Sequence, residues 1–366
     1  MLRKICALAF AISFVYGCSQ VGNSDLKTID LERNVGTKTL PFKLNDIADV
    51  VSLIEIGNPD SVMLKRARPV CEHEGKLLID GGDVLVLADI SSGSIYNKVG
   101  RKGKGPGEYI RVSGAAMDKD GNIYVCDMNP DRVLEYDRNG VYVGDLRCSR
   151  ASSLAVLPDG KFAVSVNAGK RDTVSLVICD ENAQVTRESG LKNPDIKTGM
   201  IYLDYLNRQD GNCWFKKSLV DTVYQVTSEK DIPWLVLSKG KYRIPDEDYT
   251  SLEKLNSDSY KYISNMSLKF NSRFMYLQYW YAGAMYMDMW DIEQEKLVGR
   301  NYLENPGYES IPGFEVEMDG ISSHVVPCFM SEKYMVCEFL RMEDEAELFP
   351  SLTENSNPVL LVMKFK

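Results

Sequence analysis

The stretch GRKGKGPGEY, residues 100–109, concentrates glycines and basic side chains in a chain that is otherwise acidic. A glycine-rich backbone with cationic side chains can bind an anion, so this stretch is the first candidate for chemistry. It does not match a phosphate-binding P-loop, because Pro106 stands where that motif requires a lysine after the second glycine. The candidate ligand-binding residues are Arg101, Lys102, Lys104, Glu108 and Tyr109. The alternative is a tight bend whose basic side chains are only solvated.

A second candidate is the aromatic stretch FMYLQYWYAGAMYMDMWD, residues 274–291. Exposed tyrosine and tryptophan rings can stack on sugars or peptides, and we single out Tyr279, Trp280 and Tyr281 for that role. The alternative is that these rings fill the protein core. Alternation along a strand divides the rings between two faces of a sheet, so one or two of them would be exposed.

Few residues of this sequence are candidates for acid–base catalysis or for metal binding. Asp127 and Arg132 lie five residues apart around a turn, and we interpret them as a structural ion pair, because a lone carboxylate beside a permanently charged arginine lacks a second acid–base group. The chain has only two histidines, and it has no Cys-x-x-Cys pair. We therefore predict no catalytic residues, no metal site and no cofactor.

The elements that position these candidates are predicted by a repeat. Short strand-like runs follow similar turns, in EGKLLI (74–79), DGNIYV (120–125), DGKFAV (159–164), DGNCWF (210–215), NSRFMYL (271–277) and SEKYMV (331–336). The first spacings, from Gly75 to Gly121, Gly160 and Gly211, are 46, 39 and 51 residues. Repeats of this length with four short strands are typical of β-propeller blades. The sequence therefore predicts an all-β, six-bladed propeller with four-stranded antiparallel blades.

Closure of the ring is predicted from the two ends of the domain. A strand within LPFKLNDIADVVSLIEIGN (40–58) would pair with the terminal strand NPVLLVMKFK (357–366) in the last blade, which leaves no open sheet edge. In this scheme residues 100–109 connect the outer strand of one blade to the inner strand of the next, near the mouth of the central channel. Residues 244–262 predict a short helix, and residues 341–356 predict a second irregular excursion.

Residues 100–146 resemble an NHL-type propeller repeat, with a Gly-x-Gly-Pro-Gly-x-aromatic start and the strand DGNIYV. From about residue 28 to 366 the chain is similar to the six-bladed β-propeller lipoproteins of Gram-negative gut bacteria, and the matching features are LNDIADVVSLIEI, GRKGKGPGEY and NPVLLVMKFK. The resemblance implies the fold and implies no particular activity.

The N-terminus predicts export and lipidation. Met1 to Lys4 form a positive segment, residues 5–16 are apolar but too short to span a bilayer, and Gly17-Cys18 resembles a lipobox junction. We expect a signal peptide over 1–17, a lipidated Cys18 with a flexible tether to residue 39, and the propeller over 40–366. The other seven cysteines are predicted to be mostly free thiols that pack as small apolar groups.

The composition of the chain limits the classes of partner that it is expected to bind. The net charge of −9 argues against nucleic acid, whose binding needs a concentrated basic face. Our main hypothesis is that the protein is a monomeric, non-enzymatic propeller that binds an envelope protein or a glycan on one of its faces. A lipid anchor would tether it to the outer membrane, on the periplasmic or the cell-surface side. The alternatives are a carboxylate-based glycan hydrolase or lyase with its site at the channel, and a structural subunit of an envelope complex.

Overall fold

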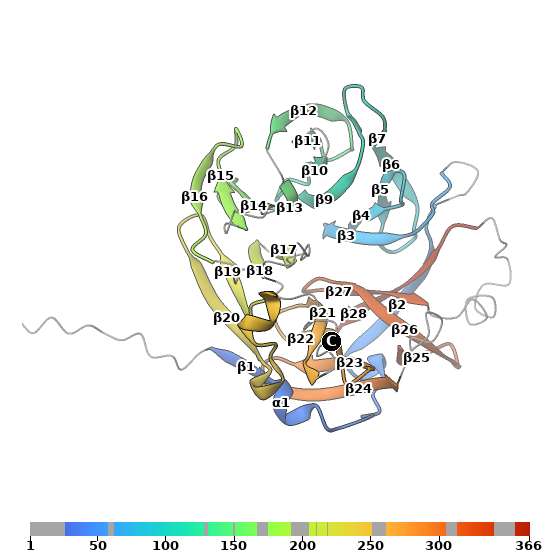
Figure 1. Ribbon diagram of the computed structural model, residues 1–366. Helices are drawn as coiled ribbons and strands as arrows, with labels where there is room; N and C mark the ends of the chain where they lie inside the picture. The colour runs from blue at the N-terminus through green and yellow to red at the C-terminus, as the bar shows by residue number, and fades with distance from the viewer. Residues whose placement is uncertain are drawn as a thin grey trace, which may run out of the picture.

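The computed structural model describes residues 26–57, 62–127, 131–148, 151–166, 175–191, 205–209, 211–217, 219–250, 261–304, 313–339 and 356–366. The strands of this part of the chain form six antiparallel blades arranged around a central axis (Figure 1). Neighbouring inner strands contact one another around that axis. The six-bladed β-propeller predicted from the sequence is confirmed.

The first five blades each contain four strands that follow one another from the axis to the rim. Blade 1 consists of β3 (Arg68–His73), β4 (Lys76–Asp80), β5 (Leu85–Asp89) and β6 (Ile95–Val99). Blade 2 consists of β9 (Val112–Met117), β10 (Ile123–Asp127), β11 (Arg132–Tyr136) and β12 (Tyr142–Arg147). Blade 3 consists of β13 (Ala151–Val156), β14 (Phe162–Val166), β15 (Leu176–Cys179) and β16 (Val185–Glu188). Blade 4 consists of β17 (Tyr205–Gln209), β18 (Asn212–Lys216), β19 (Thr222–Val226) and β20 (Asp231–Ser238). Blade 5 consists of β21 (Ser264–Phe270), β22 (Phe274–Tyr281), β23 (Ala284–Asp291) and β24 (Lys296–Glu304).

Blade 6 joins the two ends of the domain. Its strands are β26 (Ile321–Met330), β27 (Tyr334–Phe339), β28 (Val359–Phe365) and the outer strand β2 (Ala48–Glu55), and β25 (Phe314–Met318) pairs with the first half of β26. The C-terminal β28 lies between β27 and β2, with Leu361 opposite Leu53. The predicted closure of the ring through the termini is confirmed.

The recurring turn motifs of the sequence join the inner strand of each blade to its second strand. Gly121, Gly160 and Gly211 adopt φ angles of 84°, 85° and 78°, which a residue with a Cβ reaches only at a cost. The runs that follow these turns form β10, β14 and β18. All six inner strands therefore run in the same direction and end on one side of the ring, which we call the hairpin face.

The N-terminal segment begins the folded domain earlier than the sequence indicated. Strand β1 (Lys27–Asp30) pairs in parallel with β20 at the outer edge of blade 4, and the short helix α1 (Leu31–Asn34) follows it. Ile29 and Leu31 are fully buried. The tether predicted over residues 18–39 is thus too long, because its few apolar residues pack into the core and hold the segment on the propeller.

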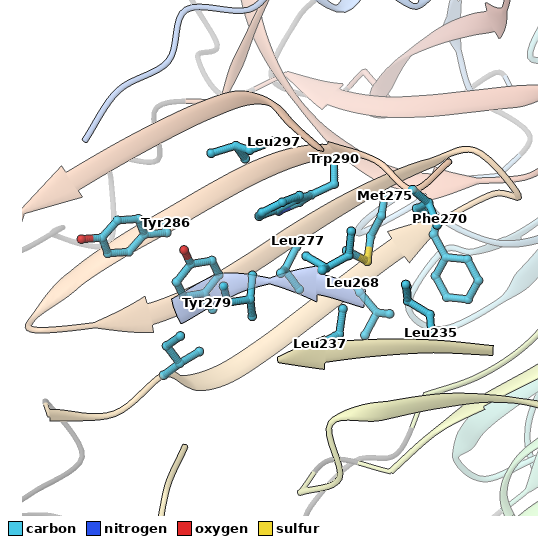
Figure 2. Close-up of a cluster of buried hydrophobic side chains, with 14 of the residues drawn as sticks. Leu235, Leu237, Leu268, Phe270, Met275, Leu277, Tyr279, Tyr286, Trp290 and Leu297 are labelled. Carbon is cyan, nitrogen blue, oxygen red and sulfur yellow. The ribbon is translucent and has the colours of Figure 1, made fainter. Parts of the chain in front are cut away.

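The largest side chains of the core lie between adjacent blades. Figure 2 shows the cluster between blades 4 and 5, where Leu235 and Leu237 of β20 face the rings and aliphatic chains of blade 5. Trp290 is completely buried there. Such packing fixes each blade against its neighbours, so the positions of residues at the central axis are set by the whole ring.

Helical structure in the described chain is limited to single turns. The insertion predicted to be helical, residues 244–262, begins with the 3₁₀ helix η3 (Asp246–Thr250), and its residues 251–260 lie outside the described residues. A second 3₁₀ helix, η2 (Gly240–Tyr242), precedes the insertion. Residues 341–355 of the second predicted excursion lie outside the described residues. None of the helices in the described part of the chain has the length and apolar character needed to cross a membrane.

Candidate functional site

The basic loop, residues 100–109, connects β6 to β9, as predicted for a blade-to-blade crossover. It contains a small parallel pair formed by β7 (Arg101–Lys102) and β8 (Glu108–Tyr109). Tyr109 is only 3% exposed, and its hydroxyl accepts from Leu85 N at 2.8 Å and donates to Val99 O at 3.2 Å. Tyr109 therefore anchors the loop in the core and cannot serve as a surface contact for a ligand.

The charges of the basic loop are partly neutralised by neighbouring carboxylates. Arg101 Nε donates to Glu108 Oε1 at 2.6 Å, and Glu108 Oε2 accepts from Gly105 N at 2.8 Å. The Gly105 amide and then the Arg101 guanidinium lower the pKa of Glu108. Lys102 Nζ lies 3.9 Å from Asp83, and Lys104 is exposed. Figure 1 shows β7 outside the inner strands, toward the rim, and not at the channel mouth where we had expected it.

Asp127 and Arg132 are brought together at the inner end of this loop. Arg132 Nη2 lies 3.5 Å from Asp127 Oδ2 and donates to Glu108 O at 2.7 Å. The Asp127 carboxylate accepts from the backbone of Ile110 and Arg111, at 3.0 Å from the latter. Through these contacts the pair joins the crossover loop to blade 2.

The aromatic candidates of β22 are mostly enclosed. Tyr279 is fully buried, stacks on Tyr286 at 5.1 Å between ring centroids, and accepts from Arg300 Nη2 at 2.8 Å. Trp280 and Tyr281 are half-buried, and Tyr281 packs edge-on against the ring of Tyr242 at 4.9 Å. Tyr279 is therefore excluded as a binding platform, because its ring is used in the core.

A polar site that the sequence analysis missed lies in the central channel. At the end of inner strand β17, Arg208 Nη1 donates to Met117 O of blade 2 at 2.9 Å. The adjacent Gln209 donates through Nε2 to Phe270 O of blade 5 at 2.5 Å and to Met330 O of blade 6 at 3.2 Å. These two side chains of blade 4 connect the ends of three other inner strands. They form what we call the channel floor, on the hairpin face.

The channel floor retains unused hydrogen-bonding capacity. Arg208 Nε and Gln209 Oε1 are buried and have no hydrogen-bond partner among the residues that the structure describes. Gln209 as a residue is only 5% exposed. A buried donor or acceptor without a partner costs free energy, so these atoms favour a water molecule or a polar ligand group that completes their bonds.

Three charged side chains from different blades are coupled electrostatically: Arg68 of β3, Lys269 of β21 and Glu338 of β27. Arg68 affects the pKa of both Lys269 and Glu338, and these two groups affect each other. Blades 5 and 1 are not neighbours, since blade 6 lies between them, so Lys269 and Arg68 can interact only on the channel side. No ion pair is formed by Arg68 or Glu338 among the residues that the structure describes. We call these three residues the channel triad.

The channel triad has perturbed acid–base properties. Burial, and then the nearby Arg68, lower the pKa of Lys269. Burial raises the pKa of Glu338, against the opposing effect of Arg68 and Lys269. Glu338 is exposed to solvent, so the effect of burial on its carboxyl is partly offset by water. Charged groups with perturbed pKa values that are coupled to one another indicate a candidate functional site.

Cys71 and Cys328 are not reactive thiols. Burial raises the pKa of Cys71 to about 12 and raises that of Cys328 well above its ordinary value, so both remain protonated thiols.

One sequence signal pointed to the channel floor. Arg208 and Gln209 directly precede the turn Asp210-Gly211, whereas Ala116 and Met117 occupy the corresponding end of the inner strand in blade 2. In this repeat a polar pair occupies positions that are apolar in blade 2. An alignment of the repeats could have shown this difference. The channel triad has no local signal, because its members are up to 270 residues apart in the sequence.

Comparisons with known proteins agree with this architecture. The chain is similar to a protein of Bacteroides fragilis NCTC 9343 considered to be exported, with 20% identity, coverage of 93% of this chain and 99% of that one, and a TM-score of 0.69. It is also similar to a member of the DUF4221 family from Bacteroides vulgatus ATCC 8482, with 12% identity, coverage of 87% and 98%, and a TM-score of 0.56. At these identities the likeness shows the fold alone. No curated protein sequence matches the chain. The model of the domain of unknown function DUF4934 matches residues 26–364, and the chain therefore belongs to the DUF4934 family.

Proposed function

We propose that this protein is an exported, lipid-anchored propeller of the cell envelope that binds a small acidic glycan in its central channel. The observations that carry the proposal are the hydrogen bonds by which Arg208 and Gln209 connect three other inner strands, together with the electrostatic coupling of the channel triad. Two cations and one carboxylate suit a ligand with one negative charge. The unused donor of Arg208 and acceptor of Gln209 suit the hydroxyl groups of a sugar.

The channel triad suits a carboxylate-bearing sugar for physical reasons. Arg68 can hold a carboxylate through two parallel hydrogen bonds, and Lys269 adds a second positive charge. An anionic ligand would stabilise the charged form of Lys269, whose pKa burial lowers in the free protein. Glu338 would accept hydrogen bonds from sugar hydroxyls and would disfavour ligands with several negative charges.

The alternative of a glycan hydrolase depends on two carboxyl groups on either side of the scissile bond. We favour binding, because the buried donor of Arg208 and the buried acceptor of Gln209 call for a polar ligand group. The lipid anchor at Cys18 and the envelope location rest on the N-terminal sequence pattern.

The proposal is tested by calorimetric titration of the full chain with sodium galacturonate and glucuronate, with galactose and glucose as neutral counterparts. We expect saturable binding of a uronate, which Lys269→Met and Arg68→Gln each weaken by at least about tenfold, as expected for a lost charge-assisted contact. Lys102→Met is the matched control, since it removes an exposed lysine at the rim. Any of three results would contradict the proposal. Neutral sugars could bind as tightly as the uronates, neither uronate could bind, or Lys102→Met and Lys269→Met could weaken binding equally.

A further inference from the structure

Blade 1 carries a row of exposed cations along the edge that lies opposite the hairpin face. This edge contains the start of β3, the turn between β4 and β5, and the end of β6, which follow one another from the axis to the rim. The basic loop continues from the end of β6. We call the row the cationic track, and all of its members are exposed: Arg68, Arg66, Lys65, Lys102, Arg101 and Lys104.

The inner end of the track coincides with the channel triad. Arg68 is the first residue of β3 and belongs to both. Arg66 and Arg68 are exposed, whereas Ala67 and Pro69 are buried. The two arginine side chains therefore point to the same side of an extended chain, with their Cα atoms about 7 Å apart.

The middle of the track surrounds the turn between β4 and β5. Arg66 Nη2 lies 2.5 Å from Asp80 Oδ2, and Lys65 Nζ lies 2.6 Å from Asp83 Oδ2. Lys102 Nζ approaches the other oxygen of Asp83 at 3.9 Å. Lys65 and Lys102 thus share one carboxylate, which brings the basic loop next to the segment that leads into β3.

The outer end of the track is held in place by the basic loop itself. The Tyr109 hydroxyl accepts from Leu85 N at 2.8 Å, which fixes the loop beside blade 1. Glu108 accepts from Gly105 N and from Arg101 Nε, at 2.8 and 2.6 Å. Arg101 uses only Nε there, and among the described residues its two Nη atoms have no partner. These atoms can hold a carboxylate through two parallel hydrogen bonds.

We propose that the cationic track binds the continuation of an acidic polysaccharide whose end occupies the central channel. This inference rests on the proposed function and extends its ligand from a single acidic sugar to a polymer with a carboxylate on successive sugars. Among the described residues, the six cations of the track outnumber the three carboxylates that pair with them, so the track is positive on a chain of net charge −9. Because the track begins at Arg68, one polymer can reach both the track and the channel.

The test is calorimetric titration of the full chain with galacturonate and with octagalacturonate. We expect the wild type to bind the octamer at least about thirtyfold more tightly, which exceeds the gain from its number of sugars, since the track offers several exposed ion pairs of small individual strength. Salt should reduce this ratio. The double variant Lys65→Met/Lys102→Met should reduce it about three- to tenfold. Lys38→Met is the matched control, because it removes an equally exposed lysine beside Glu304 of blade 5.

The track and the channel site fail by different results. If galacturonate binds through Lys269 but the double variant keeps the ratio of the wild type, or Lys38→Met lowers it equally, the track is wrong and the channel site stands. Octamer binding that needs Lys65 and Lys102 but not Lys269 would support the track and overturn the channel site. Polyglutamate of the same length that binds as tightly as the octamer would overturn the assignment to a glycan and indicate an acidic peptide.

Discussion

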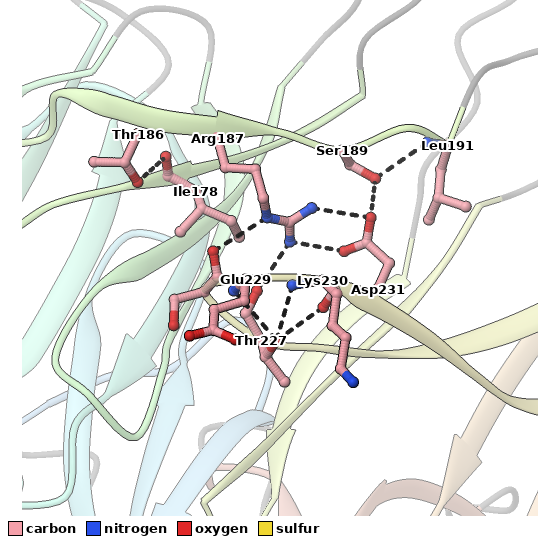
Figure 3. A network of polar contacts seen from close by, with 10 residues as sticks. Ile178, Thr186, Arg187, Ser189, Leu191, Thr227, Glu229, Lys230 and Asp231 are labelled. Carbon is pink, nitrogen blue, oxygen red and sulfur yellow. Dashed lines mark hydrogen bonds and ion pairs between the residues drawn. The ribbon is translucent and has the colours of Figure 1, made fainter. Parts of the chain in front are cut away.

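Arg187 of blade 3 and Asp231 of blade 4 form a two-point ion pair across the boundary between their blades, with Nη2–Oδ1 and Nη1–Oδ2 distances of 2.8 and 3.2 Å (Figure 3). Arg187 also donates to the carbonyl oxygens of Thr227 and Ser228, and Asp231 accepts from Ser189 Oγ at 2.6 Å. All three guanidinium nitrogens and both carboxylate oxygens therefore have a hydrogen-bond partner. The pair joins the outer strands of two neighbouring blades.

The first prediction concerns this pair. Arg187→Ala should lower the free energy of unfolding by about 2–3 kcal/mol, somewhat less than for a fully buried pair, because the arginine side chain is 19% exposed. The measurement is urea unfolding, and a double variant with Asp231→Ala should lose less than the two single losses together. Lys38→Ala removes the exposed pair with Glu304 and should lower the free energy of unfolding far less than Arg187→Ala does. Equal effects of the two single variants, Arg187→Ala and Lys38→Ala, would contradict the structural role.

The second prediction separates the charges of the basic loop from its anchor. Charge reversal at Arg101, Lys102 and Lys104 should change the free energy of unfolding little, about 0.5 kcal/mol per site at most. Tyr109→Phe should cost about 1–3 kcal/mol, because it leaves the buried Leu85 amide without its acceptor. Chemical denaturation of the two variants checks this difference. A large loss in the charge-reversal variant would mean that the basic side chains hold the crossover in place.

The fold was predictable because its signal is repeated and local. Each turn motif, such as Asp120-Gly121, is read from a few adjacent residues and recurs once per blade. The channel site was not predictable in the same way, since Arg68, Lys269 and Glu338 meet only after the ring has closed. The position predicted for the basic loop, at the channel mouth, was wrong for a related reason. Its composition is that of a binding loop, but the buried Tyr109 places it over the outer parts of blades 1 and 2.

The third prediction concerns ring closure. Deleting residues 357–366 removes β28 from between β27 and β2, so both neighbouring strands lose a partner. It also removes Asn357, which accepts from Leu64 N and donates to Ile56 O, both at 2.8 Å. Each orphaned buried group costs about 1–3 kcal/mol, and a typical domain has only about 5–15 kcal/mol to lose. The truncated chain should aggregate or be degraded, whereas a soluble product with an unchanged cooperative melt would show that closure is dispensable.

The fourth prediction concerns the proposed anchor. Cys18→Ser should release the protein from the membrane fraction or leave it unprocessed, because serine cannot carry the thioether-linked lipid. Each buried acyl methylene contributes about 0.8 kcal/mol to membrane binding, so loss of the chains should change the partition completely. Fractionation of cells that produce the wild type, Cys18→Ser and the control Cys6→Ser is the measurement. Membrane partitioning that is the same in all three would exclude Cys18 as the anchor.

The last prediction uses the raised pKa of Glu338. In the folded protein burial keeps this carboxyl protonated above its ordinary pKa of 4.5, while in the unfolded chain it ionises normally. Between these two values the folded state binds more protons than the unfolded state, so this group makes the free energy of unfolding fall as pH rises. Glu338→Gln removes the titration. The variant should match the wild type near pH 4 and become the more stable of the two toward neutral pH.

Glu304 is the control with the opposite sign. Hydrogen bonds from Tyr302 and Lys38 lower the pKa of Glu304, so its contribution is present above the ordinary carboxyl pKa and is lost as pH falls through the lowered value. Glu304→Gln should therefore be the less stable protein at neutral pH. Urea unfolding of both variants from pH 4 to pH 8 measures the two trends. If Glu338→Gln lost stability toward neutral pH as Glu304→Gln does, the channel would stabilise the Glu338 carboxylate, and the proposed burial of an unpaired charge beside Arg68 and Lys269 would be wrong.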